Sequence, residues 1–476
     1  MSLSVSTAAD SNDAATSGHP AGEIHELPVP LKLGWATGAF GIALLMNGIA
    51  GLILLFAISI LQVDPWLAGV VIFAAKLFDV VTDPLVGVWS DKHQSPRGRR
   101  RPFLFWGSLL CAASFALIFT APMLSSQYFT AGYLFGMLCL YAFAYTLFNI
   151  PYMSMPAEMT DSYHERSSIH AYRIVFVSLG GFIAGAGIKW ALERLGKTEA
   201  ASYATVGLVC AGLILVTTMI AYLSTASARH VEPRAGTGKS NAAQMVEEFN
   251  AVRGNRNFIR LIGVKFAQLM GVQTTLAAFA YFVVQYMERD FDIFVLFGIV
   301  STTSTIIAAP LMVRFSKRYG KKAAYYLAAS FNIAYSLSWT FASEGEPTWA
   351  IALRAAVIGV ALTGNVVMAM SMLTDIINDD AARTGVRREG AFTALYSFVE
   401  KLTGAIGPLI VGMALTWAGF NNKLPFDVPQ GGNVDTALLL SVSWLPAFFG
   451  LIAIWLLSGY KLDETTLAKP SPSAAQ

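Results

Sequence analysis

Residues 74–87, AAKLFDVVTDPLVG, place three ionisable side chains inside a run of apolar residues. A strongly basic loop, GVWSDKHQSPRGRRR, follows directly over residues 87–101. Apolar residues on both sides extend the run to about the 20 that a helix needs to cross the hydrocarbon core of a bilayer. An apolar run that contains charges and ends in a basic loop is typical of a membrane-spanning helix whose basic end faces the cytoplasm.

The rest of the chain has the composition of a membrane protein. Of 476 residues, 55% are hydrophobic and only 13% are charged, whereas a soluble domain carries about 25% charged residues. Twelve apolar runs follow one another, and they are continuous rather than alternating as in a β-barrel. They lie near residues 34–60, 66–89, 103–122, 129–155, 171–192, 203–224, 259–287, 292–313, 323–342, 348–373, 391–419 and 436–459. The predicted fold class is an all-α membrane protein with twelve transmembrane helices in two six-helix halves.

The longest polar stretch between apolar runs separates the sixth run from the seventh. The first residues are polar and lack the basic and then apolar pattern of a secretory signal peptide, so a disordered cytosolic tail is predicted there. The three cysteines lie inside apolar runs and are interpreted as packing residues. The predicted organisation is a tail at 1–30, an N-terminal half at 31–226, a cytoplasmic central loop at 227–257, a C-terminal half at 258–460 and a cytosolic tail at 461–476.

Lysine and arginine are distributed unevenly between alternate loops. They gather after the second run (92–101), in the central loop (229–260) and after the eighth run (314–322). Loops on the other side hold only Lys189, Arg194, Lys197, Arg289 and Lys423. Because cytoplasmic loops carry the excess of positive charge, both termini are predicted to be cytoplasmic in a protein integral to the cell (inner or plasma) membrane.

Lys76, Asp79 and Asp83 lie three and four residues apart, and so on one stripe of the second helix. Two carboxylates one turn apart repel each other unless a proton or a cation lies between them. The Thr82 hydroxyl adds an oxygen, and hard cations such as Na⁺ prefer oxygen ligands. We predict a cation site that includes Asp79, Asp83 and Thr82. A salt-bridge cluster with Lys76 that only fixes packing, or a helix that ends before Asp83, are the alternatives.

Other polar side chains lie in later apolar runs. Thr146 and Asn149 share a face of the fourth helix, where they can complete a cation shell or bind a substrate, although Asn149 can also serve as an interhelical hydrogen-bonding residue. Lys401 can approach the carboxylates of the second helix, whereas its neighbour Glu400 has no evident partner. A cavity is expected to be lined by Tyr145, Thr146, Asn149, Arg173, Gln268, Gln273, Asn365 and Lys401.

Charged residues at the ends of the fourth and tenth helices are arranged symmetrically. Asp375 and Asp379 repeat the four-residue spacing, and Glu158 and Asp161 follow the fourth helix. We expect these residues to form a cytoplasmic gate with Arg99 and Arg100. The alternative is a solvated face of mixed charge.

The loops after the second and eighth runs both contain Gly followed by basic residues, which resembles the signature loop of the major facilitator superfamily. KLFDVVTDPLVG, GRRRPFL, NIPYMSMPAEMT and YSFVEKLTGAIGP together resemble the glycoside-pentoside-hexuronide:cation symporters, of which melibiose permease is a member. This resemblance implies sugar uptake coupled to Na⁺, Li⁺ or H⁺. It implies a cation site of Asp79, Asp83, Thr82 and Thr146, with Lys401 and Arg173 as the matching basic residues.

Three positions depart from the sugar-binding members of that family. Ala43 and Asn149 stand where those members have acids, and Met153 stands where they have a tryptophan. The lysophospholipid symporters of the extended family also resemble the chain. We therefore expect a neutral or amphiphilic small solute, such as a glycoside with an apolar aglycone, rather than a simple galactoside.

Two other classes compete with a symporter. Two Asp-x-x-x-Asp pairs can bind Mg²⁺-diphosphate in an intramembrane prenyltransferase, and a scramblase or receptor can share a transporter scaffold. Twelve runs in two halves favour transport. We expect a non-enzymatic monomer in the bilayer that has Na⁺ or H⁺ as its coupling ion, no cofactor and no nucleic-acid partner.

Overall fold

The computed structural model describes residues 27–93, 95, 98, 100–160, 163–227, 252, 254–384, 388–460 and 462, and every regular element in this part of the chain is helical. The N-terminal half consists of α1 (Val29–Leu55), α2 (Pro65–Lys92), α3 (Arg101–Phe119), α4 (Gln127–Met159), α5 (Tyr163–Phe182), α6 (Ile188–Leu195) and α7 (Ala200–Ser224). The C-terminal half consists of α9 (Arg256–Tyr281), α10 (Ile293–Tyr319), α11 (Lys321–Ser338), α12 (Thr348–Thr384), α13 (Glu389–Trp417), α14 (Asn433–Leu439) and α15 (Leu445–Ser458). Short π or 3-10 turns extend or join these helices: η1 (Phe56–Ile60), η2 (Ile183–Gly187), η3 (Thr225–Ser227), η4 (Phe282–Tyr286), η5 (Trp339–Phe341) and η6 (Leu440–Trp444).

The twelve predicted runs correspond to these helices once the turns η2 and η6 are counted as local breaks. η2 joins α5 to α6, and η6 joins α14 to α15. Among the described residues, 11 helices are long and apolar enough to cross a membrane. The twelfth, α11, has 18 residues and begins with Lys321 and Lys322. The predicted central loop and both tails fall largely outside the described residues, although α1 already begins at Val29.

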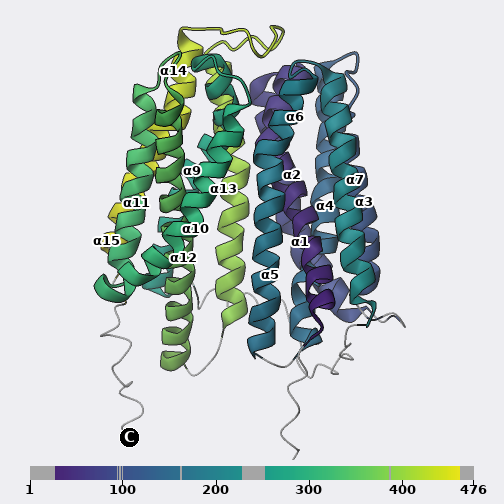
Figure 1. Cartoon of the computed structure of the whole chain (residues 1–476), viewed down its shortest axis with the longest axis vertical. Coiled ribbons are helices and arrows are strands. Elements are labelled where there is room, and N and C mark those ends of the chain that lie inside the picture. The colour runs from purple at the N-terminus through teal and green to yellow at the C-terminus, as the bar shows by residue number, and fades with distance from the viewer. Residues whose placement is uncertain are drawn as a thin grey trace, which may run out of the picture.

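The two halves stand side by side as separate bundles (Figure 1), with α1–α7 in one and α9–α15 in the other. Within the bundles α1 packs along α5 and α7, and α10 packs along α12. Between the bundles α2 packs along α13. Gly412 on α13 lies so close to the carbonyl oxygen of Pro65 that a Cβ atom there would overlap it. This close approach brings α2 and α13 together near the first turn of α2.

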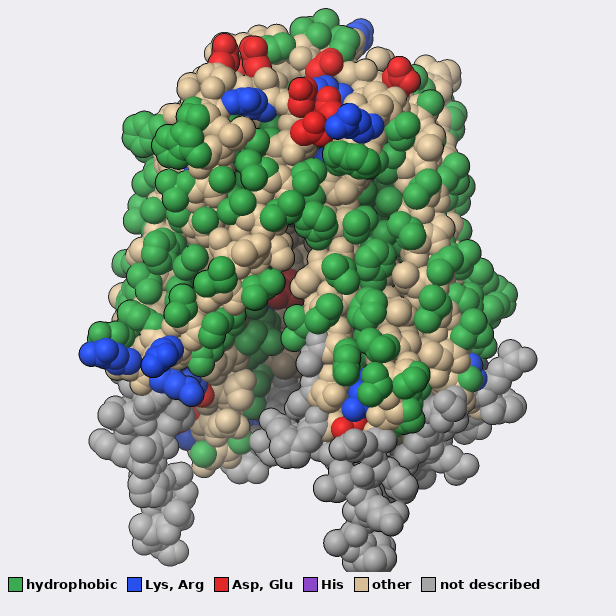
Figure 2. All heavy atoms as spheres, in the orientation of Figure 1, with side chains coloured by type: hydrophobic (Ala, Val, Ile, Leu, Met, Phe, Trp, Pro, Cys, Tyr) green, Lys and Arg blue, Asp and Glu red, His purple; other side chains and the backbone are tan. Residues whose placement is uncertain are grey.

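The halves meet at the end of the molecule that carries α6 and α14, which we call the closed end. Asn422 donates a hydrogen bond to the Gln62 carbonyl at 2.8 Å, and Lys197 lies 2.7 Å from Asp290. Toward the opposite end a hollow separates the halves, and an acidic side chain is visible deep inside it (Figure 2). This open end carries the last turn of α10, with Lys317 and Arg318, and the start of α3 at Arg101, which the sequence predicts to be cytoplasmic. The central space is therefore accessible from that end.

Candidate functional site

A central cavity of about 590 Å³ lies between the two halves. Its walls come from α1, α2 and α4 on one side and from α9 and α13 on the other. Its lining mixes apolar and polar side chains. The polar members are Asn47, Lys76, Asp79, Asp83, Tyr141, Tyr145, Asn149, Gln273, Ser397, Glu400 and Lys401.

Asp79, Asp83 and Thr146 form a cluster of oxygen atoms on the wall of this cavity. Their placement follows from the four-residue spacing on α2 and from the packing of α4 against α2. The Thr146 hydroxyl lies 2.7 Å from Asp83 Oδ1 and 3.3 Å from Asp79 Oδ1. Asp79 is 3% exposed and Thr146 is fully buried. The hydroxyl oxygen thus lies within hydrogen-bond distance of both carboxylates, and its single proton is shared between them.

Lys401 supplies the positive charge that these carboxylates need, and it comes from α13 in the other half. Its ammonium lies 3.0 Å from Asp79 Oδ2 and also contacts Asp83 Oδ2. The predicted approach of Lys401 to the carboxylates is confirmed. Lys401 belongs to one half and the two carboxylates to the other. A cation that took the place of its ammonium would therefore break the ion pairs that join the halves.

Two residues near the cluster have other partners than the sequence suggests. The Thr82 hydroxyl donates its proton to the backbone carbonyl of Asp79 at 3.1 Å; its oxygen keeps its lone pairs, so its place in the cation site stays a prediction. The Lys76 ammonium lies 5.5 Å from the centre of the Tyr141 ring. Among the described residues it forms no ion pair with Asp79 or Asp83. The neutralising role considered for Lys76 belongs to Lys401 in this structure.

Glu400 has a partner that the sequence does not reveal. The Lys265 ammonium on α9 lies 2.6 Å from Glu400 Oε1 and 2.8 Å from the centre of the Tyr396 ring. The Glu400 side chain is 56% exposed, and it lines the cavity. The cavity therefore has a second fixed charge pair, which lies entirely inside the C-terminal half.

Besides the buried Thr146, four predicted substrate-site residues are absent from the described lining of the cavity. Gln268 accepts a hydrogen bond from Tyr325 at 2.6 Å, which ties it into the interior of the C-terminal half. Asn365 is fully buried and has no hydrogen-bond partner among the described residues. Arg173 and Met153 do not belong to the described lining either. In the conformation observed these side chains lie outside the described lining, so their predicted contact with a substrate stays a prediction.

The predicted gate residues pair inside their own halves. Arg100 donates to Glu158 at 2.8 Å, and Lys321 lies 2.5 Å from Asp375. Asp379 pairs with Arg383 one turn along the same helix at 3.0 Å. Arg99 and Asp161 lie outside the described residues. At this open end no cross-half pair among the described members is formed, so their predicted role in a shut gate stays a prediction.

Some cavity residues have signals that sequence reasoning missed. Tyr141 precedes Tyr145 and Asn149 at intervals of four residues, so the helical period places all three on one face of α4. Lys265 is a basic residue inside an apolar run, and such residues are functional candidates for that reason alone. Asn47 is a polar residue inside the apolar run of α1 and lines the cavity, and its amide donates to the Ala43 carbonyl at 2.8 Å.

Two helical halves around a central cavity with charged residues at its wall define a secondary membrane transporter. Residues 34–464 match the family described as MFS/sugar transport protein. The chain belongs to this family, and its fold is that of the major facilitator superfamily.

Similar proteins agree with this assignment. The sodium-dependent lysophosphatidylcholine symporter 1 of Xenopus tropicalis is 24% identical, over 92% of this chain and 88% of its own. The isoprimeverose transporter of Lactiplantibacillus pentosus is 23% identical, over 97% of this chain and 95% of its own. The crystal structure of the nucleoside transporter NupG (D323A mutant) is similar in fold, with a TM-score of 0.60 and 16% identity over 92% of this chain and 100% of that one.

Proposed function

We propose that this chain is a symporter that couples the movement of Na⁺ or H⁺ to that of a glycoside-like or amphiphilic small solute by alternating access. The observation that carries the proposal is the cluster of Asp79, Asp83 and Thr146 with Lys401 from the opposite half. Two carboxylates and a hydroxyl are oxygen donors of the kind that hard cations prefer. A proton on either carboxylate would relieve the same repulsion.

In this proposal Lys401 acts as a tethered counter-ion. While the site lacks a mobile cation, its ammonium balances the carboxylates and links α13 to α2. When Na⁺ or H⁺ binds, the carboxylates need Lys401 less, and the ion pairs across the interface weaken. A ligand shifts a conformational equilibrium only by its different affinity for the two states. Here that difference arises because the cation competes with a bond between the halves.

The solute would bind in the same cavity, beside the cation. A volume of about 590 Å³ falls within the range of about 300–1,000 Å³ usual for small-molecule sites. Tyr145, Asn149 and Gln273 offer hydrogen bonds, while Leu138, Leu269 and Leu276 offer apolar contact. Such a mixture suits a solute with a polar and an apolar part. One of the relatives is named as a transporter of the sugar isoprimeverose and another as a symporter of lysophosphatidylcholine.

Simple galactosides are not the proposed cargo, because Ala43, Asn149 and Met153 replace two acids and an aromatic ring. Each lost charge-assisted hydrogen bond weakens binding by about 1.5–3 kcal/mol. Two such losses raise a dissociation constant by a factor on the order of 100 or more. Submillimolar uptake of melibiose or lactose would contradict this part. We further propose that the chain acts as a monomer with cytoplasmic termini, no cofactor and no catalytic step.

The test is transport by the purified protein in liposomes. Solutes are first screened by thermal shift with and without Na⁺, and uptake of each hit is then driven by a Na⁺ or a proton gradient. Accumulation that requires one of the gradients is the expected result. Solute flux that never exceeds equilibrium under either gradient would overturn coupling. Lipid scrambling without a cation gradient would favour the alternative of a scramblase.

A further inference from the structure

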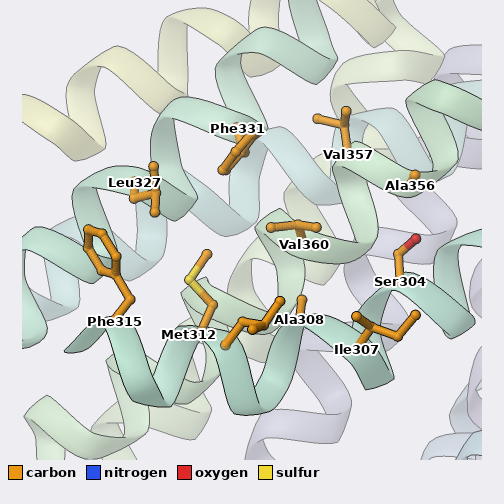
Figure 3. A pocket seen from close by; sticks show the side chains of 11 residues that line it. Ser304, Ile307, Ala308, Met312, Phe315, Leu327, Phe331, Ala356, Val357 and Val360 are labelled. Atoms are coloured by element: carbon orange, nitrogen blue, oxygen red, sulfur yellow. The ribbon is translucent and has the colours of Figure 1, made fainter. Parts of the chain in front are cut away.

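A second hollow lies away from the central cavity, where α10, α11 and α12 meet (Figure 3). Its volume is about 370 Å³. Ser304 provides the one polar side chain on its described walls. The apolar members are Ile307, Ala308, Leu311, Met312, Phe315, Leu327, Phe331, Ala356, Val357 and Val360. Ile307 and Leu311 are 58% and 60% exposed, respectively, so this groove opens on the outer surface of the protein.

The groove has the length of one leaflet of a bilayer. Its α10 wall runs from Ser304 to Phe315, which is about 16 Å at 1.5 Å per residue. Half of the hydrocarbon core of a bilayer is about 15 Å thick. Phe315 lies only one turn before the end of α10 at Tyr319. The groove therefore extends from the middle of the membrane to its surface at the open end.

A positive charge lies where the groove reaches that surface. The groove-facing row of α10, which contains Ser304, Leu311 and Phe315, continues to Arg318 by helical periodicity. Arg318 lies roughly 50° from the centre of this row, whereas Lys317 lies roughly 150° away. Both side chains are exposed, and neither forms an ion pair with an acidic residue among those described. An unpaired cation at the mouth of an apolar groove complements an anionic group attached to an apolar chain.

We propose that this groove binds one acyl chain of an anionic phospholipid from the leaflet at the open end, with Arg318 holding the phosphate group. The acyl chain matches the groove in length and polarity, and the phosphate matches the charge at its mouth. Anionic headgroups bind at basic sites between transmembrane helices in this way. Arg318 lies 5.4 Å from the centre of the Tyr319 ring, and a sterol would give it no anionic partner. The site is separate from the central cavity, with which the described lining shares no residue.

The test is a lipid titration of the full chain in detergent, followed by native mass spectrometry. Dioleoyl phosphatidylglycerol is the anionic probe, and dioleoyl phosphatidylcholine is the zwitterionic comparison. We expect one phosphatidylglycerol to bind more tightly than phosphatidylcholine. Arg318→Gln should weaken that binding by about fivefold, the value of one surface cation. Lys317→Gln removes the same charge from the opposite face of the same turn and should leave the binding unchanged.

Filling the groove tests the acyl-chain contact separately. Ala356→Phe, with Ser304→Phe as a second variant should the first not fold, should abolish binding of the preferred phosphatidylglycerol. Equal losses in Arg318→Gln and Lys317→Gln would mean unspecific surface attraction and would overturn the proposal. So would full binding by a folded groove-filled variant. Na⁺-dependent thermal shifts should persist in Arg318→Gln, so failure of this proposal is distinguishable from failure of the proposed symport.

Discussion

The chain carries the Asp-x-x-x-Asp spacing twice, once on α2 and once on α12, and the two pairs have different surroundings. Asp79 and Asp83 share Lys401, which comes from the other half, and the hydroxyl of Thr146. Asp375 pairs with Lys321 at 2.5 Å, and Asp379 pairs with Arg383 of its own helix at 3.0 Å. The same spacing thus gives one pair that bridges the interface and another whose described partners lie within one half. The two pairs thus differ in the origin of their counter-charge, which comes from the other half for Asp79 and Asp83 and from the same half for Asp375 and Asp379.

The largest expected effect comes from neutralising Asp79 or Asp83, which we call the interface pair. Asp79→Asn or Asp83→Asn removes a charged ligand worth about 1.5–3 kcal/mol, which would weaken apparent cation affinity by about 10- to 150-fold. Cation-driven accumulation in liposomes should be abolished, while downhill solute exchange persists in part. Asp375→Asn is the matched change on α12 and should leave the apparent cation affinity unchanged, even where the rate of uptake changes through the predicted gate. Full concentrative uptake by the Asp79→Asn, Asp83→Asn double variant would show that the cation binds elsewhere.

Removing the counter-charge sharpens the comparison. Lys401→Met leaves two carboxylates without their cation, and breaking a buried pair costs about 3–5 kcal/mol. We expect the low end of that range, because the Asp83 side chain is 32% exposed. The melting temperature should fall in cation-free buffer and recover with Na⁺, because Na⁺ takes the place of the ammonium.

The control for this prediction is Lys321→Met, which removes the partner of Asp375. The Lys321 and Asp375 side chains are 30% and 19% exposed, whereas the Asp79 side chain beside Lys401 is only 5% exposed. Because both members of the Lys321 pair are partly solvated, its loss should cost about 1 kcal/mol. A small loss of stability that Na⁺ does not restore is expected. If Na⁺ restored both variants equally, the distinction between the two aspartate pairs would fail.

A smaller effect separates the two threonines next to the interface pair. Thr146→Val removes the hydroxyl that contacts both carboxylates, and a hydrogen bond is worth about 0.5–1.5 kcal/mol. The apparent cation affinity should therefore fall by about 2- to 12-fold. Thr82→Val has the same change of shape, but its hydroxyl binds the Asp79 carbonyl instead. Sodium titrations read out by thermal stability measure the apparent cation affinity of both variants. A larger loss of affinity in Thr82→Val than in Thr146→Val would contradict the prediction.

The sequence predicts the helices and the interface pair well, for physical reasons. Apolar runs of membrane length determine the spans, and helical period determines that Asp79 and Asp83 share a face. A charge buried in such a run requires a partner, and Lys401 is a basic residue that can serve as one. Such inferences need only the period of one helix or the requirement that a buried carboxylate be neutralised.

Other features depend on how neighbouring helices are rotated, and the sequence does not determine that. Gln268 and Asn365 are polar residues in apolar runs, like Gln273, yet only Gln273 lines the cavity. Thr82 lies beside both carboxylates in sequence, but its hydroxyl is satisfied within α2. Glu400 gains Lys265 from a helix far away in the chain. Such pairings appear only when the helices are assembled.

The smallest expected effect concerns the closed end, where Lys197 bonds both to Glu193 of its own half at 3.2 Å and to Asp290 of the other half at 2.7 Å. Asp290→Asn removes only the charge of the bond between the halves. Its side chain is 70% exposed, so the bond contributes about 0–1 kcal/mol. The ratio of the two conformations should therefore shift by at most about fivefold toward opening of the closed end. Spin-label distances across that end would measure the shift.

The pH dependence of the same bond follows from the pKa of Lys197. Burial lowers this pKa, but the hydrogen bonds to Asp290 and Glu193 outweigh burial and raise it above the ordinary 10.5. A raised lysine pKa means that the stabilisation is fully present below the ordinary pKa and is lost only as pH rises through the raised value. The difference between the distance distributions of the unchanged protein and Asp290→Asn should thus be constant between about pH 6 and pH 9. This difference should instead respond to salt, which screens exposed charges. A difference that followed pH but not salt in that range would assign the effect of Asp290 to another contact.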